Sequence, residues 1–256
     1  MIVPGFNHRF PKEGSDDYLW SYADCQARLD REDHLIESCC TTLDEALVAE
    51  SRGASRIELC VDLSAGGFTP PRDLIRDVVA ALTIPVNVLI RPSTRENCAG
   101  VDPQSAPRVE EFFFEDFVYD EADLEKMVED IAYCKSVGAA GIVVGALTRE
   151  GAIDQAAMRQ LVAAAHPLPV TFHRAFDVCT ENPFAALETI ITLGCARLLT
   201  SGQAPNAWEG RELIHQLKQS AGDRIVILAG KGITAANLPA LSVATGVKEF
   251  HGTHIP

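Results

Sequence analysis

The chain has 256 residues, of which 47% are hydrophobic, enough apolar material for one large core or two smaller domains. Its formal net charge of −14 argues against nucleic acid as a partner, because neutralising phosphates requires a basic surface. No run approaches the roughly 18 consecutive apolar residues of a membrane span, and the first residues lack the apolar core of a secretion signal. The eight cysteines form no CxxC pair. We therefore predict a cytoplasmic protein with reduced thiols that binds neither membranes nor nucleic acid.

From residue 34 onward, short apolar runs alternate with helical patterns. We expect strands at 35–39, 56–60, 86–91, 141–144, 169–173, 197–200, 225–229 and 248–251. We expect helices between them at 42–53, 71–82, 121–137, 154–165, 183–193, 206–220 and 234–244. Eight strands joined by helical crossovers predict an α/β fold, a (β/α)8 TIM barrel, rather than an open doubly wound sheet. No Gly-x-Gly-x-x-Gly follows the first strand, so we predict no organic cofactor.

Three segments depart from a plain barrel. Residues 93–118 are long and irregular, which predicts a lid or an insertion after the third strand. The chain stops soon after His251, so we expect the barrel domain, residues 34–256, to lack its eighth helix, either as a fragment or as a shortened form. Residues 1–33 are a predicted N-terminal extension that either is disordered or carries a short helix covering the bare flank. Five of its residues fall at helical spacing: Tyr18, Leu19, Tyr22, Cys25 and Leu29.

Polar side chains recur at alternate positions near the ends of several predicted strands. Residues i and i+2 of a strand share a face. The pairs with this spacing are Glu37 and Cys39, Glu58 and Cys60, Thr171 and His173, and Glu249 and His251. In a closed barrel the eighth, first and second strands are neighbours, so three of these pairs should converge inside it. Barrel enzymes place their sites at the C-terminal ends of the strands.

Several of these segments resemble the CutC copper homeostasis family. They are Glu37-x-Cys39, Arg56-Ile57-Glu58-Leu59-Cys60, Gly66-Gly67-x-Thr69-Pro70, Ile90-Arg91-Pro92, Thr171-Phe172-His173-Arg174-Ala175-Phe176-Asp177, Leu199-Thr200-Ser201-Gly202 and Glu249-Phe250-His251. The resemblance implies a cytosolic TIM barrel, commonly a homodimer, that handles copper. It also implies that Cys39 and Cys60 are the positions that bind Cu(I). It does not establish an enzymatic activity.

Some positions depart from the family pattern. Asp116-Phe117-x-Tyr119 resembles its lid motif, but Glu115 stands where the family has glycine. Ser93 replaces a second arginine after Arg91-Pro92. These two differences weaken the expectations of lid closure and of anion binding. Lys231 stands where the family has a small residue, and a cation there favours an anion.

Copper chemistry suits the two cysteines, because Cu(I) is soft and prefers thiolate ligands. Adjacent strands lie roughly 4.8 Å apart, so facing thiols on the first two strands could bridge one ion. The same spacing would suit a disulfide. A third interpretation is that both cysteines simply pack as small hydrophobic residues.

The alternative function is a lyase or isomerase that acts on a small anionic or phosphorylated metabolite. Its predicted catalytic residues are Glu37, Glu58, His173, Arg174 and Asp177. Its predicted substrate-binding residues are Arg91, Asp116, Tyr119, Thr200, Ser201, Gly202, Gly230, Gly232 and His251. The structural alternatives are an Arg174–Asp177 ion pair that fixes a loop and a carboxylate layer neutralised by arginine and histidine.

Overall fold

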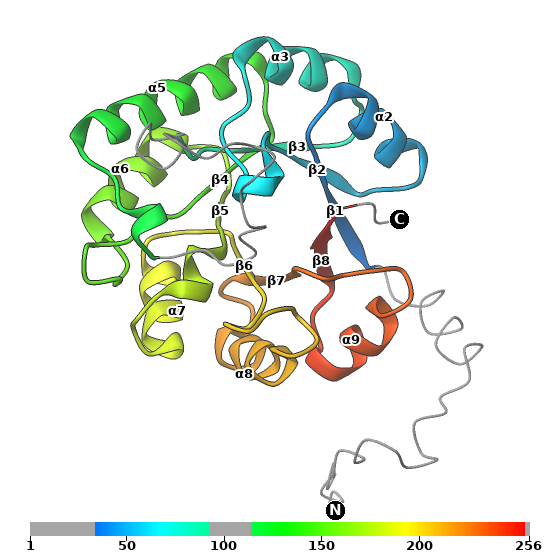
Figure 1. Cartoon of the computed structure of the whole chain (residues 1–256), viewed down its shortest axis with the longest axis vertical. Coiled ribbons are helices and arrows are strands. Elements are labelled where there is room, and N and C mark those ends of the chain that lie inside the picture. The colour runs from blue at the N-terminus through cyan, green and yellow to red at the C-terminus, as the bar shows by residue number, and fades with distance from the viewer. Residues whose placement is uncertain (1–33, 93–113, 254–256) are drawn as a thin grey trace, which may run out of the picture. The chain divides into compact units, whose positions relative to one another are not determined.

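The computed structural model describes residues 34–92 and 114–253 of the chain. Eight parallel strands pair in chain order and close into a barrel, with β8 hydrogen-bonded to β1 (Figure 1). The strands are β1 (Leu35–Cys40), β2 (Arg56–Leu59), β3 (Val86–Leu89), β4 (Gly141–Val144), β5 (Val170–Phe172), β6 (Arg197–Thr200), β7 (Val226–Gly230) and β8 (Glu249–Gly252). This arrangement confirms the (β/α)8 barrel predicted from the alternation of strands and helices.

Seven α-helices in the described ranges surround the barrel. They are α2 (Leu43–Ser51), α3 (Arg72–Ala81), α5 (Glu121–Val137), α6 (Gln155–Ala165), α7 (Pro183–Thr192), α8 (Arg211–Ala221) and α9 (Leu238–Thr245). The described loops contain three short 3₁₀ segments: η2 (Leu63–Ala65), η3 (Phe114–Phe117) and η4 (Arg174–Val178). No α-helix follows β8 up to residue 253, as the sequence predicted.

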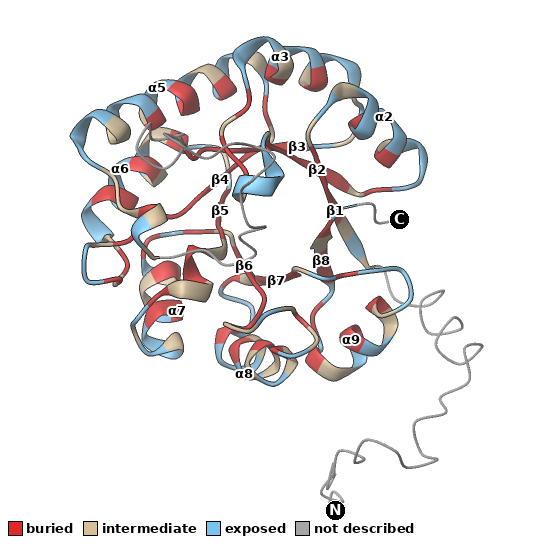
Figure 2. Cartoon of the chain, viewed as in Figure 1, coloured by how far each residue is buried: buried red, intermediate tan, exposed pale blue. Residues whose placement is uncertain are grey.

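The strands are buried on both faces because helices cover the outside and side chains fill the inside (Figure 2). Each helix turns an apolar stripe inward, as α3 does with Ile75 and Val78. Helix α5 has matched end signals. Asp120 forms a capping box with Asp123, and Gly138 closes the helix with a φ of +88°.

Two helices begin later than predicted, at Arg211 rather than residue 206 and at Leu238 rather than residue 234. Before α8, the Asn206 side chain accepts a hydrogen bond from the Glu209 backbone and forms a turn. Before α9, Thr234 and Asn237 exchange hydrogen bonds in another turn. Local side-chain bonds therefore compete with the first helical turn at both places.

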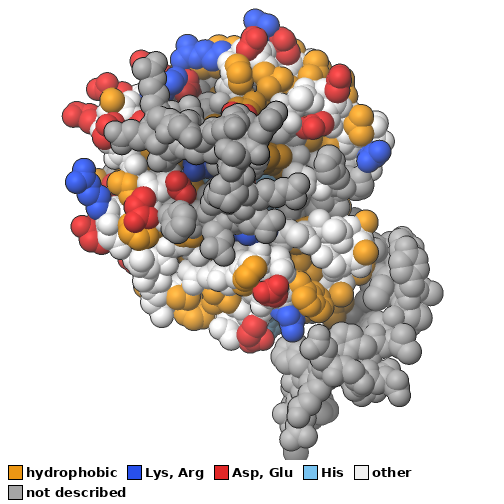
Figure 3. Space-filling view, viewed as in Figure 1, with side chains coloured by type: hydrophobic (Ala, Val, Ile, Leu, Met, Phe, Trp, Pro, Cys, Tyr) orange, Lys and Arg blue, Asp and Glu red, His pale blue; other side chains and the backbone are white. Residues whose placement is uncertain are grey.

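The predicted N-terminal extension lies outside the described residues, and so does most of the predicted insertion at 93–118. Both stay predictions. The described end of the insertion forms η3, whose Phe117 is buried. None of the helices in the described ranges is both long and apolar enough to cross a membrane. On the part of the face visible in Figure 3, the lysine and arginine side chains stand among acidic ones around the rim.

Candidate metal centre in the barrel

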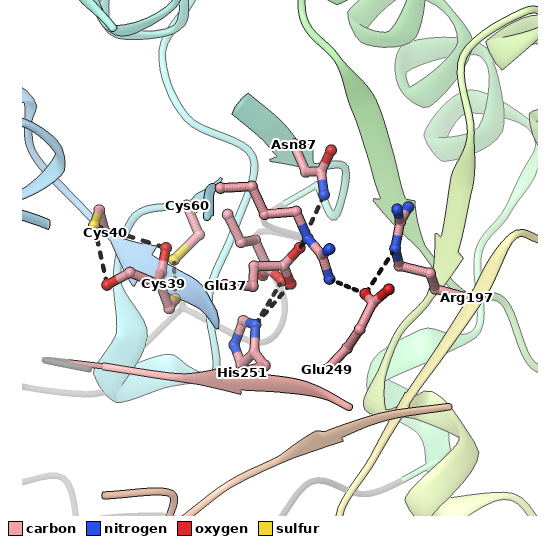
Figure 4. Close-up of polar contacts among 11 residues, drawn as sticks. Glu37, Cys39, Cys40, Cys60, Asn87, Arg197, Glu249 and His251 are labelled. Atoms are coloured by element: carbon pink, nitrogen blue, oxygen red, sulfur yellow. Dashed lines mark hydrogen bonds and ion pairs between the residues drawn. The ribbon is translucent and has the colours of Figure 1, made fainter. Parts of the chain in front are cut away.

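The barrel interior near the N-terminal ends of the strands holds a network of buried charges. Glu37 accepts hydrogen bonds from Arg56 Nε at 2.5 Å and from Asn87 Nδ2 at 2.9 Å. Arg56 also donates from Nη2 to Glu249 at 2.6 Å, and Arg197 Nε lies 3.2 Å from the same carboxylate oxygen. Figure 4 shows the Glu37, Asn87, Arg197 and Glu249 side chains of this network converging from different strands. The predicted carboxylate layer neutralised by arginine is therefore present.

The strand register explains why these groups meet. Glu37 lies opposite Arg56 on β2 and opposite His251 on β8. Glycine at position 141 makes room for the amide, since a Cβ there would lie 2.4 Å from Asn87 Oδ1. Side chains of three neighbouring strands thus lie side by side at one level of the barrel.

His251 joins this network to Glu58. Its Nδ1 lies 2.9 Å from Glu37 Oε1 and 3.5 Å from Glu58 Oε2. Burial raises the pKa of Glu58 to about 7, an effect only partly offset by His251 and Arg56. Burial would also raise the pKa of Glu37, but the hydrogen bonds and positive charge of His251 and Arg56 lower it to about 2. Glu58 Oε2 has no hydrogen-bond partner among the described residues.

The two cysteines predicted to bind metal lie directly above this network. The Sγ atoms of Cys39 and Cys60 are 3.4 Å apart, and both side chains are buried with Leu89 and Val143. Neither is in a disulfide. Contact with Cys60, burial and the nearby Glu58 charge raise the pKa of Cys39 well above its usual value, so its thiol is protonated at neutral pH. Cys40 lies away from this pair, with its Sγ 3.7 Å from the Ser38 carbonyl.

A candidate metal-ligand set emerges from these positions. One ligand atom each of Cys39, Glu58 and His251 lies within 4.8 Å of the others, and Cys60 adds a second sulfur. Sulfur and imidazole nitrogen suit soft or borderline ions such as Cu(I) and Zn²⁺. The donor set and its burial therefore fit a thiophilic metal ion.

A second group of polar residues lies at the mouth of the barrel. The His173 ring packs 4.9 Å from the Phe117 ring, and Gly145 makes room for it, because a Cβ there would lie 2.6 Å from His173 Nδ1. Arg91 lies between Phe68 and Phe117, at 4.8 and 5.0 Å from the ring centroids. Arg91 Nη1 also donates to the carbonyls of residues 65 and 67.

His173 and Tyr119 each bury an unpaired polar atom in this group. His173 Nδ1 accepts from the Ala175 backbone, whereas its Nε2 and the Tyr119 hydroxyl have no hydrogen-bond partner in the described ranges. Burial and the charge of Arg91 lower the pKa of His173 to about 3, so the ring is neutral. Burial raises the pKa of Tyr119. Glu58 contacts His251, whereas His173 packs against Phe117, and the predicted pairing of Glu58 and His173 as acid and base stays a prediction.

Asp177, predicted as catalytic, is fully engaged in holding two loops together. Its carboxylate accepts hydrogen bonds from the Thr200 hydroxyl at 2.5 Å, from the Ser201 backbone and hydroxyl at 3.0 and 2.9 Å, and from the Gln203 backbone. Arg174 forms the ion pair that the structural alternative anticipated, with an Nε–Oδ2 distance of 2.9 Å. These contacts make Asp177 the anchor of the loop after β6.

The predicted glycine positions also have structural roles. Gly202 has a φ of +72°, and a Cβ there would lie 2.3 Å from the Gly210 carbonyl oxygen. Gly230 faces the barrel interior, where a Cβ would lie 2.5 Å from Leu199 Cδ1. The Gly232 carbonyl accepts from Asn237 Nδ2 at 2.7 Å. Asp116 lies in η3 at the mouth, partly exposed. A phosphate site at Gly230 and Gly232 stays a prediction.

The sequence analysis did not select Arg56, Asn87 or Arg197 as site residues. Arg56 precedes Glu58 by two positions, so the alternation used for the carboxylates also places it inside the barrel. Asn87 is a polar residue within a buried strand, which is the same kind of signal.

The family model described as the CutC family matches residues 34–101 and 108–256. The chain belongs to the CutC family. The copper homeostasis protein cutC homolog of Homo sapiens is 43% identical over 217 residues, which cover 85% of this chain and 72% of the human protein.

Solved structures agree with this assignment. A crystal structure described as a copper homeostasis protein CutC, from Streptococcus agalactiae, is 32% identical, with a TM-score of 0.75. The match covers 87% of this chain and 100% of that one. A structure described as an aldolase, QR15, has a TM-score of 0.59 at 13% identity, covers 84% of this chain and 88% of the other, and shows the shared fold alone.

Proposed function

We propose that this CutC-family chain takes part in copper homeostasis by binding Cu(I) through Cys39 and Cys60. The observation that carries the proposal is the 3.4 Å separation of the two Sγ atoms in a buried, reduced pair. Two thiolates within a buried apolar cluster are the ligands that Cu(I) prefers over oxygen donors. The printed description of the human relative, a copper homeostasis protein homolog, supports the same function.

Loading the site requires the thiols to lose their protons. The contact with Cys60, burial and the nearby Glu58 charge raise the pKa of Cys39 and keep it protonated before the ion arrives. A bound cation favours the thiolate, so Cu(I) uptake should release protons to the solvent. Leu89 and Val143, packed against the cysteines, keep water from competing for the ion.

An anaerobic Cu(I) titration against a chromogenic chelator tests the proposal. The wild-type protein should take up one Cu(I) per chain, and the Cys39→Ala/Cys60→Ala variant should lose that uptake. Cys40→Ala is the matched control, because Cys40 is an adjacent buried cysteine that lies away from the pair. Equal uptake by the double variant and the wild type would refute the proposal.

A second candidate function is a site for a small anionic metabolite at the mouth. It is favoured by His173 Nε2 and the Tyr119 hydroxyl, which have no hydrogen-bond partner among the described residues. Buried polar atoms without partners cost free energy unless a ligand satisfies them. Arg91 influences both groups electrostatically. Thermal-shift screening of phosphate esters and carboxylates tests this candidate, with Tyr119→Phe as the variant that should lose the shift. If these compounds stabilise the wild type and Tyr119→Phe equally, or stabilise neither protein, the result would count against this candidate.

The proposal includes a cytoplasmic protein that assembles as a homo-oligomer, as the family resemblance implies. Light scattering coupled to size-exclusion chromatography measures the assembly directly. A mass equal to one 27.7 kDa chain would contradict this part of the proposal.

A further inference from the structure

His251 lies between the charge network and the cysteine pair. Its Nδ1 faces Glu37 Oε1 at 2.9 Å, and Figure 4 shows the other ring nitrogen on the side of the cysteines. One of its ring nitrogens is within 4.8 Å of Cys39 Sγ. The ring is therefore in place to contribute to an ion held by sulfur.

The network fixes the tautomer of this ring. Glu37 accepts from Arg56 and Asn87, so its carboxylate is an acceptor and the shared hydrogen belongs to His251 Nδ1. Because Nδ1 keeps its hydrogen toward Glu37, Nε2 is the nitrogen that gives up its proton and offers a lone pair when an ion binds. This is the arrangement in which metal-binding histidines are held by carboxylates.

Glu37 itself cannot turn away from the ring. Its side chain is fully buried, and Arg56, which holds it, is in turn held by Glu249 at 2.6 Å. The orientation of the imidazole is therefore fixed by side chains from β1, β2 and β8 before any ion binds.

We propose that His251 is a third ligand for the metal ion through Nε2, with Glu37 and Arg56 as its positioning residues. The inference rests on the proposed Cu(I) site at Cys39 and Cys60. It makes the site a three-coordinate one with two sulfurs and one nitrogen. Glu58, a hard oxygen donor, is not needed as a ligand for a soft ion.

The coordination number is measured by copper K-edge X-ray absorption on anaerobically Cu(I)-loaded protein. The wild type should show two sulfurs and one nitrogen. His251→Asn is the sharpest variant, because the Asn amide can still donate to Glu37 but offers no second nitrogen. It should show sulfur ligands alone and bind Cu(I) more weakly, by at least about tenfold.

Glu37→Gln tests the positioning role. It keeps an acceptor oxygen near Nδ1 but loses the charge that holds Arg56, so Cu(I) affinity should fall about 10–100-fold while the two sulfurs remain. Melting temperatures of the copper-free variants show whether each is folded.

A wild-type spectrum with sulfur ligands and no nitrogen would overturn the inference, whatever the variants do. Unchanged affinity in a folded His251→Asn protein would do so as well. The proposed function fails separately: in that case the Cys39→Ala/Cys60→Ala variant itself keeps its Cu(I).

Discussion

Replacing Arg56 with methionine should destabilise the barrel strongly. The change removes the guanidinium shared by Glu37 and Glu249, whose side chains are 0% and 10% exposed, so water cannot replace it. Each charge-assisted hydrogen bond is worth about 1.5–3 kcal/mol, and breaking a buried ion pair by removing one partner costs about 3–5 kcal/mol. Because His251 and Arg197 still contact the two carboxylates, we expect a loss near the lower end, about 3 kcal/mol.

Urea unfolding followed by far-ultraviolet circular dichroism measures the loss as a shift of the transition midpoint. The transition midpoint of Arg56→Lys should fall between those of the wild type and Arg56→Met. An ammonium keeps the charge but not the planar guanidinium that contacts both carboxylates. Arg224→Ala is the control, since Arg224 pairs with Glu188 on the exposed surface and should leave the midpoint unchanged. If Arg56→Met unfolds at the same urea concentration as Arg224→Ala, the argument that this network stabilises the barrel is wrong.

Three other changes test the site. Burial raises the pKa of Glu58 from 4.5 to about 7, so the folded state keeps a proton that the unfolded state loses. The wild type should therefore lose stability relative to Glu58→Gln as pH rises from about 4.5 to 7, by at most about 3 kcal/mol in unfolding titrations. If the free energies of unfolding of the two proteins change in parallel with pH, this prediction is wrong. Cys39 must lose a proton to bind metal, so Cu(I) affinity should rise with pH, by up to about tenfold per pH unit for each thiol deprotonated. Chelator competition from pH 6 to 8 measures this change, and an affinity that does not vary with pH would exclude the coupling. Asp177→Ala should lower thermal stability by about 2–4 kcal/mol, because several buried donors of the β6 loop lose their acceptor; a melting temperature equal to that of the wild type would show that the loop does not need it.

The barrel could be predicted from sequence because its signals are local and repeated. Each strand is a short apolar run, and several helices carry their own caps, as the Asp120 capping box and Gly138 do for α5. The errors fell where a side chain offers the backbone another partner, as Asn206 does before α8. Such competition depends on loop geometry, which no periodic pattern encodes.

The facing of Cys39 and Cys60 was within reach of the sequence, since alternation and strand order place both inside a closed barrel. The aromatic surroundings of His173 were not, because alternation gives the face of a strand but not the loop residues that pack on it. The Phe117 ring of η3 lies 4.9 Å from the His173 ring, a contact between loops that appears only in the folded protein.

The two motifs that identify the chain most specifically by resemblance, residues 171–177 and 199–202, turn out to be halves of one hydrogen-bonded unit. Asp177 at the end of the first accepts hydrogen bonds from Thr200 and Ser201 in the second, so these three side chains are engaged within the fold. Polar residues at strand ends therefore have two physical origins in this barrel: anchoring of loops and construction of a site. The distinguishing property is whether their hydrogen-bonding and ligating atoms are already satisfied. By that criterion the Asp177 unit is structural, whereas the Cys39–Cys60 pair with His251 retains atoms that can bind an ion.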